Sequence, residues 1–184
     1  MFALLGLGAS SAAGGDWTPV GLTGGGGMFV PAISPLDSSH MMVNCDMSDA
    51  FLTRDGGENW TMIHHRQLGG NVWCRAVFHP RDKNIVFAVG GWNDRLKISR
   101  DGGVHWEEWG DLPEGAVELA VDQGRPDLML AALGDGGVFF STDGGAHWIK
   151  SQGIPDRVYG LHIDQTSPVG ARTCLAGAGD GGFP

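Results

Sequence analysis

Acidic side chains occur in this sequence in two settings that predict two different roles. Asp46 and Asp49 stand three residues apart in the segment NCDMSDAF (44–51). Two carboxylates in one loop can do general acid and base chemistry when their surroundings favour different protonation states. The open alternative is that each carboxylate caps backbone N–H groups of its own loop.

Three other aspartates belong to an octet that the sequence repeats. The copies are TRDGGENW (53–60), SRDGGVHW (99–106) and STDGGAHW (141–148), with the aspartates 46 and 42 residues apart. Paired glycines permit the positive φ of a tight hairpin, and the carboxylate can accept hydrogen bonds from the turn's own N–H groups. A catalytic acid is not needed three times at regular spacing. We therefore expect structural roles for Ser99, Asp55, Asp101, Asp143, Gly57, Gly103, Gly145, Trp60, Trp106 and Trp148.

Short strand-like segments accompany each octet. Around the second they are CRAVFHP (74–80), NIVFAVG (84–90), RLKISRD (95–101) and HWEEW (105–109), each rich in β-branched or aromatic residues or alternating in polarity, and bounded by turn residues. Four antiparallel strands in a repeat of 40–50 residues are typical of a β-propeller blade. The alternative is a β-sandwich with a repeated hairpin.

The predicted fold is therefore all-β, an incomplete propeller of about three and a half four-stranded antiparallel blades within residues 16–184. We expect the blades at 17–65, 72–110, 115–151 and 157–184. The last stops inside its third strand, so we expect either a part of a longer protein, which we favour, or a chain that pairs with another. The missing part would be the rest of this propeller or a second one.

Composition narrows the classes of partner. The net charge is −9, from 12 basic and 21 acidic residues, and no basic patch stands out, which argues against nucleic acid and anionic membranes. Residues 1–15 contain FALLGLGASSAA (2–13), which predicts the remnant of a signal peptide and a secreted or periplasmic protein but is too short to span a membrane. Cys45, Cys74 and Cys174 are too scattered for a zinc site, so we expect no metal and no cofactor.

The octet resembles the Asp box, or BNR repeat, of sialidases, sortilin-type receptors, photosystem II assembly factors and xyloglucan-hydrolysing glycoside hydrolases. This resemblance implies the propeller fold and leaves the activity open.

A second resemblance concerns residues 17–51, WTPVGLTGGGGMFVPAISPLDSSHMMVNCDMSDAF, which are similar to the start of the xyloglucan-hydrolysing glycoside hydrolases. In that family a glycine run and a Pro-containing strand precede a T-D-x-G-G-A-Y loop with a catalytic Asp. Asp46 matches that Asp, while Cys45 replaces Thr and Ser48-Asp49 replace Gly-Gly. The resemblance implies hydrolysis of a β-glucan or xyloglucan-like polysaccharide, with the partner carboxylate on a second propeller.

The loops opposite the octets are the chemically rich ones, and we expect substrate there. Trp73 and Trp92 are candidate sugar-stacking platforms, with blade packing as their alternative, and Asp49 and Arg75 are further candidate substrate-binding residues. His64 and His65 lack a second pair at metal-ligand spacing. Two other functions stay open: a non-enzymatic module that binds protein or glycan, and a sialidase that uses Tyr159 with Arg75 and Arg157.

Overall fold

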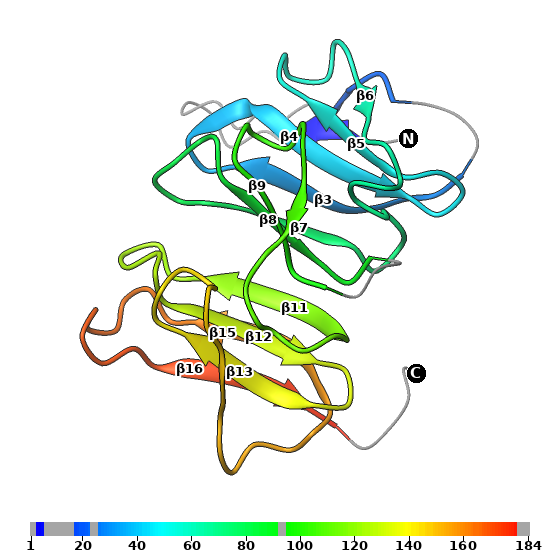
Figure 1. Ribbon diagram of the computed structural model, residues 1–184. Helices are drawn as coiled ribbons and strands as arrows, with labels where there is room; N and C mark the ends of the chain where they lie inside the picture. The colour runs from blue at the N-terminus through cyan, green and yellow to red at the C-terminus, as the bar shows by residue number, and fades with distance from the viewer. Residues whose placement is uncertain (1–2, 6–16, 23–25, 92–94, 180–184) are drawn as a thin grey trace.

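The computed structural model describes residues 3–5, 17–22, 26–91 and 95–179, which form strands, turns and loops without a helix. Three four-stranded antiparallel sheets follow one another along the chain, each with its strands in sequence order (Figure 1). We name these sheets blades 1, 2 and 3. Two further sheets have two strands each.

The strand bounds lie close to the predicted segments. Blade 1 consists of β3 (Met28–Ser34), β4 (Asp37–Cys45), β5 (Ala50–Thr53) and β6 (Thr61–Met62). Blade 2 consists of β7 (Arg75–Phe78), β8 (Val86–Val89), β9 (Lys97–Ser99) and β10 (Glu107–Glu108). Blade 3 consists of β11 (Ala116–Val121), β12 (Met129–Leu133), β13 (Gly137–Ser141) and β14 (Ile149–Lys150). The two-stranded sheets pair β1 (Ala3–Leu5) with β2 (Trp17–Pro19), and β15 (Val158–Ile163) with β16 (Cys174–Ala178).

The hydrophobic core lies between neighbouring sheets. One cluster of buried side chains, including Leu52 and Val86, joins blades 1 and 2. A second, including Leu96 and Met129, joins blades 2 and 3, and a third, around Val138 and Val158, joins blade 3 to β15. The first strands β3, β7, β11 and β15 contact one another in turn. Sheets that pack face to face with their first strands side by side are propeller blades, so the predicted fold is confirmed.

Strand order sorts the connections onto two faces. In each blade an octet glycine N–H donates to a carbonyl in or beside the turn between the first two strands: Gly56 to Ser39 O near the start of β4, Gly102 to Asn84 O and Gly144 to Asp127 O. We call this side the octet face. The loops between second and third strands and the connections between sheets lie on the opposite side, which we call the loop face.

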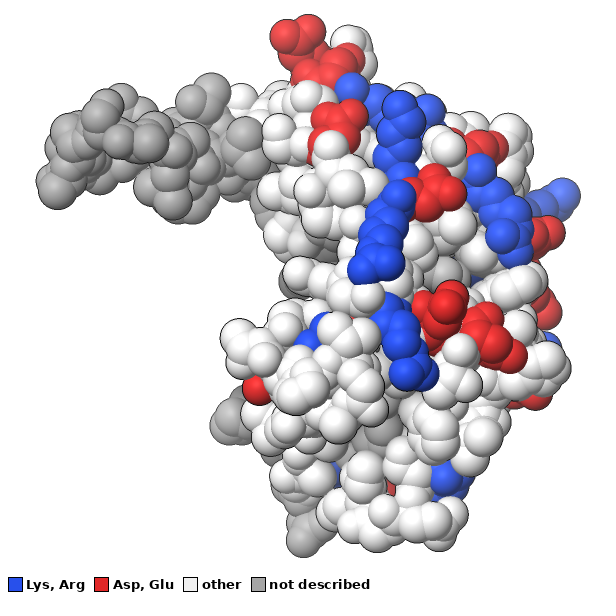
Figure 2. Space-filling view, turned by 90° about the vertical axis from the view of Figure 1, so that its left-hand side faces the viewer, with Lys and Arg blue, Asp and Glu red and all other residues white. Residues whose placement is uncertain are grey.

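On the octet face, arginines link neighbouring sheets. Arg54 of blade 1 donates to the carbonyl oxygens of Asp101 and Gly102 in blade 2, and Arg81 of blade 2 donates to Gly124 O in blade 3. Figure 2 shows basic side chains following one another down this side of the molecule, with acidic ones beside them.

The N-terminal prediction is tested only in part. Ala3–Leu5 pairs with Trp17–Pro19, and the other residues of 1–15 lie outside the described part of the chain, so the signal peptide stays a prediction. Within the described residues, no helix is long and apolar enough to cross a membrane.

Candidate functional site

Asp46 lies on the loop face, directly after β4, and its carboxylate is fixed by the glycine-rich segment. The Gly27 N–H donates to Asp46 Oδ1 at 2.8 Å, and the Asp46 N–H donates to Gly27 O at 3.2 Å. The Asp46 side chain is exposed. A carboxylate held by one backbone N–H and open to solvent can meet a substrate without first changing its position.

The close approach of the glycine-rich segment to the Asp46 side chain requires glycine at residue 26. A Cβ at residue 26 would lie 2.3 Å from Asp46 Oδ1 and 2.9 Å from Cys45 Sγ. Real Cβ atoms do not come so close to other heavy atoms, so any larger residue would move the carboxylate. Residues 23–25, which include the first glycines of the run, lie outside the described residues.

A bulge in β3 determines which residues of β3 and β4 lie opposite each other near Asp46. Phe29 pairs with Asn44 and Ala32 with Met42, so three residues separate the pairs on β3 against two on β4. Val30 has φ of 48°, a conformation that a β-branched residue rarely adopts. The bulge bends the strand between Phe29 and Ala32, while Met28 pairs with Cys45 and leaves Gly27 opposite Asp46.

Trp73 comes to the same edge from the connection between blades 1 and 2. The Asn44 side-chain amide donates to Cys74 O at 2.6 Å, which places this connection beside the end of β4. The Trp73 N–H donates to Asn71 Oδ1 at 2.8 Å, and the Trp73 side chain is 56% exposed. An exposed, anchored indole near an exposed carboxylate suits recognition of a sugar ring.

Trp92 lies outside the described residues, together with Asn93 and Asp94, so its predicted role stays untested. Their neighbour Gly90 borders Trp73, because a Cβ at residue 90 would fall 2.4 Å from Trp73 O.

Asp49 is half-buried and differs from Asp46 in its surroundings. Burial raises the pKa of Asp49, while the Gly70 N–H and the nearby His65 and His64 oppose that rise. The His64 and His65 rings stack with centroids 4.5 Å apart. Among the described residues, no group of three or more His, Cys, Asp or Glu is placed to hold a metal ion.

Arg75 has a structural contact that the sequence did not reveal. Its Nε lies 3.3 Å from Glu118 Oε2 and donates to Val117 O at 3.1 Å, which joins β7 to β11. Burial raises the pKa of Glu118, and the Arg75 charge opposes this rise. A substrate-binding role of Arg75 stays a prediction.

The octets have a common local geometry. The Ser or Thr hydroxyl donates to the Asp carboxylate at 2.7–2.9 Å and accepts from the second glycine N–H at 2.7–3.0 Å. The carboxylate accepts from the N–H four residues on, which belongs to Asn59, His105 or His147. The indoles of Trp106 and Trp148 donate to the second glycine's carbonyl, whereas that of Trp60 donates to Val20 O.

These hydrogen bonds hold the octet carboxylates in the charged form. Bonds from the Asn59 N–H, the Asn59 amide and the Thr53 hydroxyl lower the pKa of Asp55 to about 2. Burial would raise the pKa of Asp101, but bonds from His105 and Ser99 outweigh it and lower this pKa to about 2. The bonds from His147 and Ser141 likewise lower the pKa of Asp143. An acid that stays charged is poorly suited to donate a proton in catalysis.

The comparisons with known proteins concern the fold. No protein-family model matches the chain, and no curated protein matches its sequence. The GH74 xyloglucanase from Xanthomonas campestris matches in structure with a TM-score of 0.69 and 20% identity, over 89% of this chain and 29% of that one. An ancestral GH74 enzyme matches with a TM-score of 0.64 and 18% identity, over 81% and 22%.

A second group of similar structures is YCF48. YCF48 from Cyanidioschyzon merolae matches with a TM-score of 0.53 and 21% identity, over 72% of this chain and 39% of that one. YCF48 bound to D1 peptide matches with a TM-score of 0.50 and 19% identity, over 74% and 44%. The chain thus spans less than a third of those GH74 structures and less than half of those YCF48 structures. Identities this low support the propeller fold and do not assign an activity.

Proposed function

We propose that the loop face binds a β-glucan or xyloglucan-like polysaccharide and that Asp46 is one of two carboxylates that hydrolyse it. The observation that carries this proposal is the exposed Asp46 carboxylate, held by the Gly27 N–H on the same loop face as the exposed Trp73 indole. The fold similarity to a GH74 xyloglucanase and the resemblance of residues 17–51 to that class support it. A polysaccharide substrate of this kind also implies export from the cell.

The chemistry assigned to Asp46 is one half of an acid and base pair. Glycoside hydrolysis needs one carboxyl to protonate the leaving oxygen and a second to activate water or attack the sugar. The Gly27 N–H holds the Asp46 carboxylate in place, and in this proposal Asp46 acts as the base or nucleophile while the partner acts as the acid. In this proposal a further propeller of the intact protein supplies the partner.

Polysaccharide binding tests the first half of the proposal. The intact protein is expected to be retarded in affinity electrophoresis through xyloglucan or mixed-linkage β-glucan, and Trp73→Ala to reduce the retardation at least tenfold. Arg81→Ala, on the octet face, serves as the matched control and is expected to migrate like the wild type. Equal retardation of the Trp73→Ala variant and the wild type would remove the loop face as the glycan site.

A second candidate function is a module that binds a peptide without catalysis. It is favoured by the fold similarity to YCF48 bound to D1 peptide. The two candidates separate on one result: a peptide-binding module releases no reducing ends from any glycan. Nothing in the described residues favours a sialidase, since Arg75 is engaged with Glu118 and Val117 O.

A further inference from the structure

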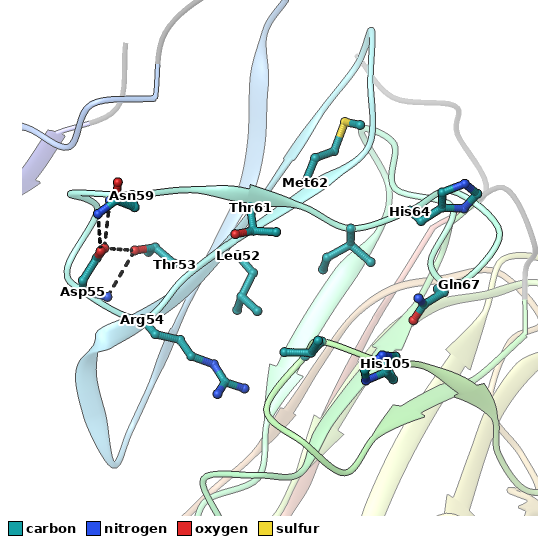
Figure 3. A pocket seen from close by; sticks show the side chains of 13 residues that line it. Leu52, Thr53, Arg54, Asp55, Asn59, Thr61, Met62, His64, Gln67 and His105 are labelled. Atoms are coloured by element: carbon teal, nitrogen blue, oxygen red, sulfur yellow. Dashed lines mark hydrogen bonds between the residues drawn. The ribbon is translucent and has the colours of Figure 1, made fainter.

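A groove of about 520 Å³ opens at the outer rim between blades 1 and 2, apart from the proposed glycan site (Figure 3). Leu52 and Ile63 are buried in its floor, and Met62 and Val104 line it with exposed fractions of 54% and 42%. Arg54, His64, Gln67 and His105 also line it. In Figure 3, Arg54 and His105 come from the two blades with Leu52 between them.

The same position in the next junction carries an aromatic ring, and the hollow left there, lined by Ile98 and Arg100, is smaller, at about 350 Å³. Ile63 and Trp109 are structurally equivalent, since the Ile63 N–H donates to Ala50 O at 2.8 Å and the Trp109 N–H to Leu96 O at 2.9 Å. Each follows its octet tryptophan by three residues. The Trp109 indole reaches blade 3, where its Nε1–H donates to Gly144 O at 2.9 Å. The guanidinium of Arg100 lies 4.6 Å from the centroid of that ring.

The residue that follows Ile63 or Trp109 is a second difference between the junctions. Gly110 follows Trp109 with φ of 71°, and a Cβ there would fall 1.9 Å from Gly145 O. Gly21 follows Val20 with φ of 77°, and its Cβ would fall 3.1 Å from Gly57 O. Glycine thus lets the preceding strand approach octets 1 and 3 closely. At octet 2 the residue is His64, which carries a side chain where the other two junctions have glycine.

The groove is therefore larger than the hollow in the next junction because Ile63 is smaller than Trp109 and because His64 stands where the next junction has Gly110. Arg54 stands where Arg100 stands in the next blade, one residue before the octet Asp. Arg100 covers an indole, whereas Arg54 donates to the carbonyl oxygens of Asp101 and Gly102 at the edge of the groove. The next junction thus offers a pattern for an occupant of the groove, namely a flat ring beneath a guanidinium.

We propose that this groove receives the aromatic side chain of a partner peptide, a tryptophan or a tyrosine. The ring lies on Leu52 and Ile63, between Met62 and Val104, with its face toward Arg54, as Trp109 lies beneath Arg100. The outer edge of the two-residue strand β6 pairs with no other strand of the described residues, so an extended peptide can align along it.

Ring-current shifts in methyl NMR spectra test the proposal on the intact protein. N-acetyl-L-tryptophanamide is the probe, and N-acetyl-L-leucinamide is its aliphatic control. We expect the Leu52, Met62 and Ile63 methyl signals to move upfield with the tryptophan probe alone. The Val138 methyls, which are buried in the separate cluster between blade 3 and β15, are expected to stay unchanged.

Three variants test whether the probe binds in this groove. Ile63→Trp supplies the ring from within and is expected to abolish the probe-induced shift at Leu52; Val104→Trp, on the exposed wall, gives the same test if Ile63→Trp does not fold. Arg54→Gln is expected to weaken binding roughly two- to fivefold, as loss of an exposed cation–π contact does. Equal shifts with both probes, no shift at millimolar probe, or a Leu52 methyl already ring-shifted by the chain's own residues would overturn the proposal.

Discussion

At the residue scale, the protein uses aspartate in two ways that its surroundings separate. The octet carboxylates accept hydrogen bonds from their own turn, and these bonds lower the pKa of each. Asp46 instead accepts its backbone hydrogen bond from Gly27, nineteen residues away, and its side chain faces solvent. The proposed chemical role of Asp46 follows from this second kind of environment.

Gly26→Ala is the sharpest residue-scale test of how Asp46 is placed. The new Cβ would lie 2.3 Å from Asp46 Oδ1, so the carboxylate must move. We expect turnover of xyloglucan by the folded variant to fall at least tenfold, because a displaced carboxylate loses its near-attack position, and the melting temperature is measured alongside because the new Cβ would also lie 2.9 Å from the buried Cys45 Sγ. Gly170→Ala, where the added Cβ meets nothing within 4 Å, is the matched control. Unchanged turnover in Gly26→Ala would mean that this contact does not position Asp46.

Acid sensitivity is a second residue-scale prediction. The pKa values of Asp55 and Asp101 are depressed to about 2 in the folded state, against about 3.9 in an unfolded chain. Their stabilising effect is therefore complete above about pH 4 and is lost as the pH falls through about 2. We expect the melting temperature to drop across this window. The Asp55→Asn/Asp101→Asn variant should show a flatter profile, and a drop as steep as that of the wild type would contradict this assignment.

At the scale of elements, the last strand of each blade determines how the next blade is met. β6 and β10 have the same length and hydrogen-bonding position, yet the groove beside Ile63, at about 520 Å³, is larger than the hollow of about 350 Å³ in the junction that contains Trp109. The repeated octets allowed the strands and their order to be predicted, because turn chemistry is local. The contents of each junction could not be predicted, since they depend on which side chain two different blades leave room for.

Trp109 is expected to contribute to stability both as a packed ring and as a donor. Trp109→Ala should lower the free energy of unfolding by about 3 kcal/mol, because it removes a partly buried ring. Trp109→Phe keeps the ring and removes the hydrogen bond to Gly144 O, so it should lower that free energy by about 1 kcal/mol. Urea unfolding measures both changes. Equal losses in the two variants would show that packing is not the main contribution.

At the scale of the whole molecule, the contacts between blades are the features that sequence patterns could not predict. The fold joins Arg75 to Glu118 and Val117 O across a blade boundary, a contact that the sequence did not reveal, and the predicted substrate-binding role of Arg75 stays untested. Asp46 could be singled out from the sequence only by resemblance, whereas its support by Gly26 and Gly27 depends on the bulge in β3. Such contacts link residues far apart in the chain and have no local signature.

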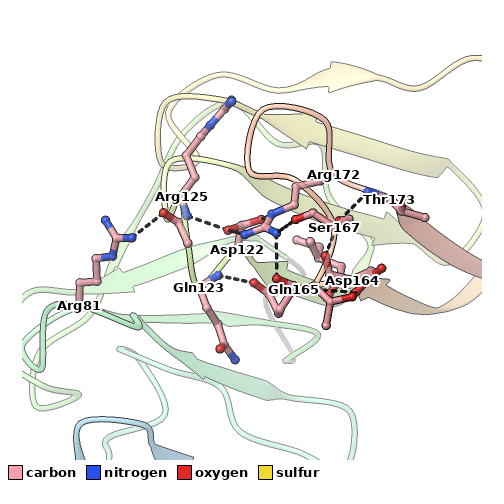
Figure 4. Close-up of polar contacts among 12 residues, drawn as sticks. Arg81, Asp122, Gln123, Arg125, Asp164, Gln165, Ser167, Arg172 and Thr173 are labelled. Atoms are coloured by element: carbon pink, nitrogen blue, oxygen red, sulfur yellow. Dashed lines mark hydrogen bonds and ion pairs between the residues drawn. The ribbon is translucent and has the colours of Figure 1, made fainter.

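Arg172 and Asp122 provide a further link between sheets, which Figure 4 shows on the octet face. Arg172 Nε and Nη2 donate to the Asp122 carboxylate, and Nη1 donates to Gln165 O and Ser167 O. The two side chains are 4% and 0% exposed. The bridge ties the β15–β16 hairpin to the turn between β11 and β12.

Removal of one partner of this buried pair should be strongly destabilising. Arg172→Leu leaves the Asp122 carboxylate buried without its counter-ion, so we expect a loss of about 3–5 kcal/mol in the free energy of unfolding. The double variant Asp122→Leu/Arg172→Leu should lose less than the sum of the two single variants, because it leaves no unpaired charge. Denaturant unfolding of the four proteins gives this comparison, and strict additivity would contradict a coupled pair.

The proposed role of Asp46 in polysaccharide hydrolysis is tested by the rate at which the Asp46→Asn variant hydrolyses a glycan. Reducing ends released from xyloglucan and mixed-linkage β-glucan are counted for the intact wild type, Asp46→Asn and the control Asp135→Asn, whose aspartate pairs with Arg157 in the corresponding loop of blade 3. We expect Asp46→Asn to lose at least a thousandfold in turnover yet still bind the glycan, while Asp135→Asn stays near the wild type. Wild-type-like turnover by Asp46→Asn would contradict the catalytic assignment, and no turnover by the wild type on any glycan would favour the peptide-binding alternative.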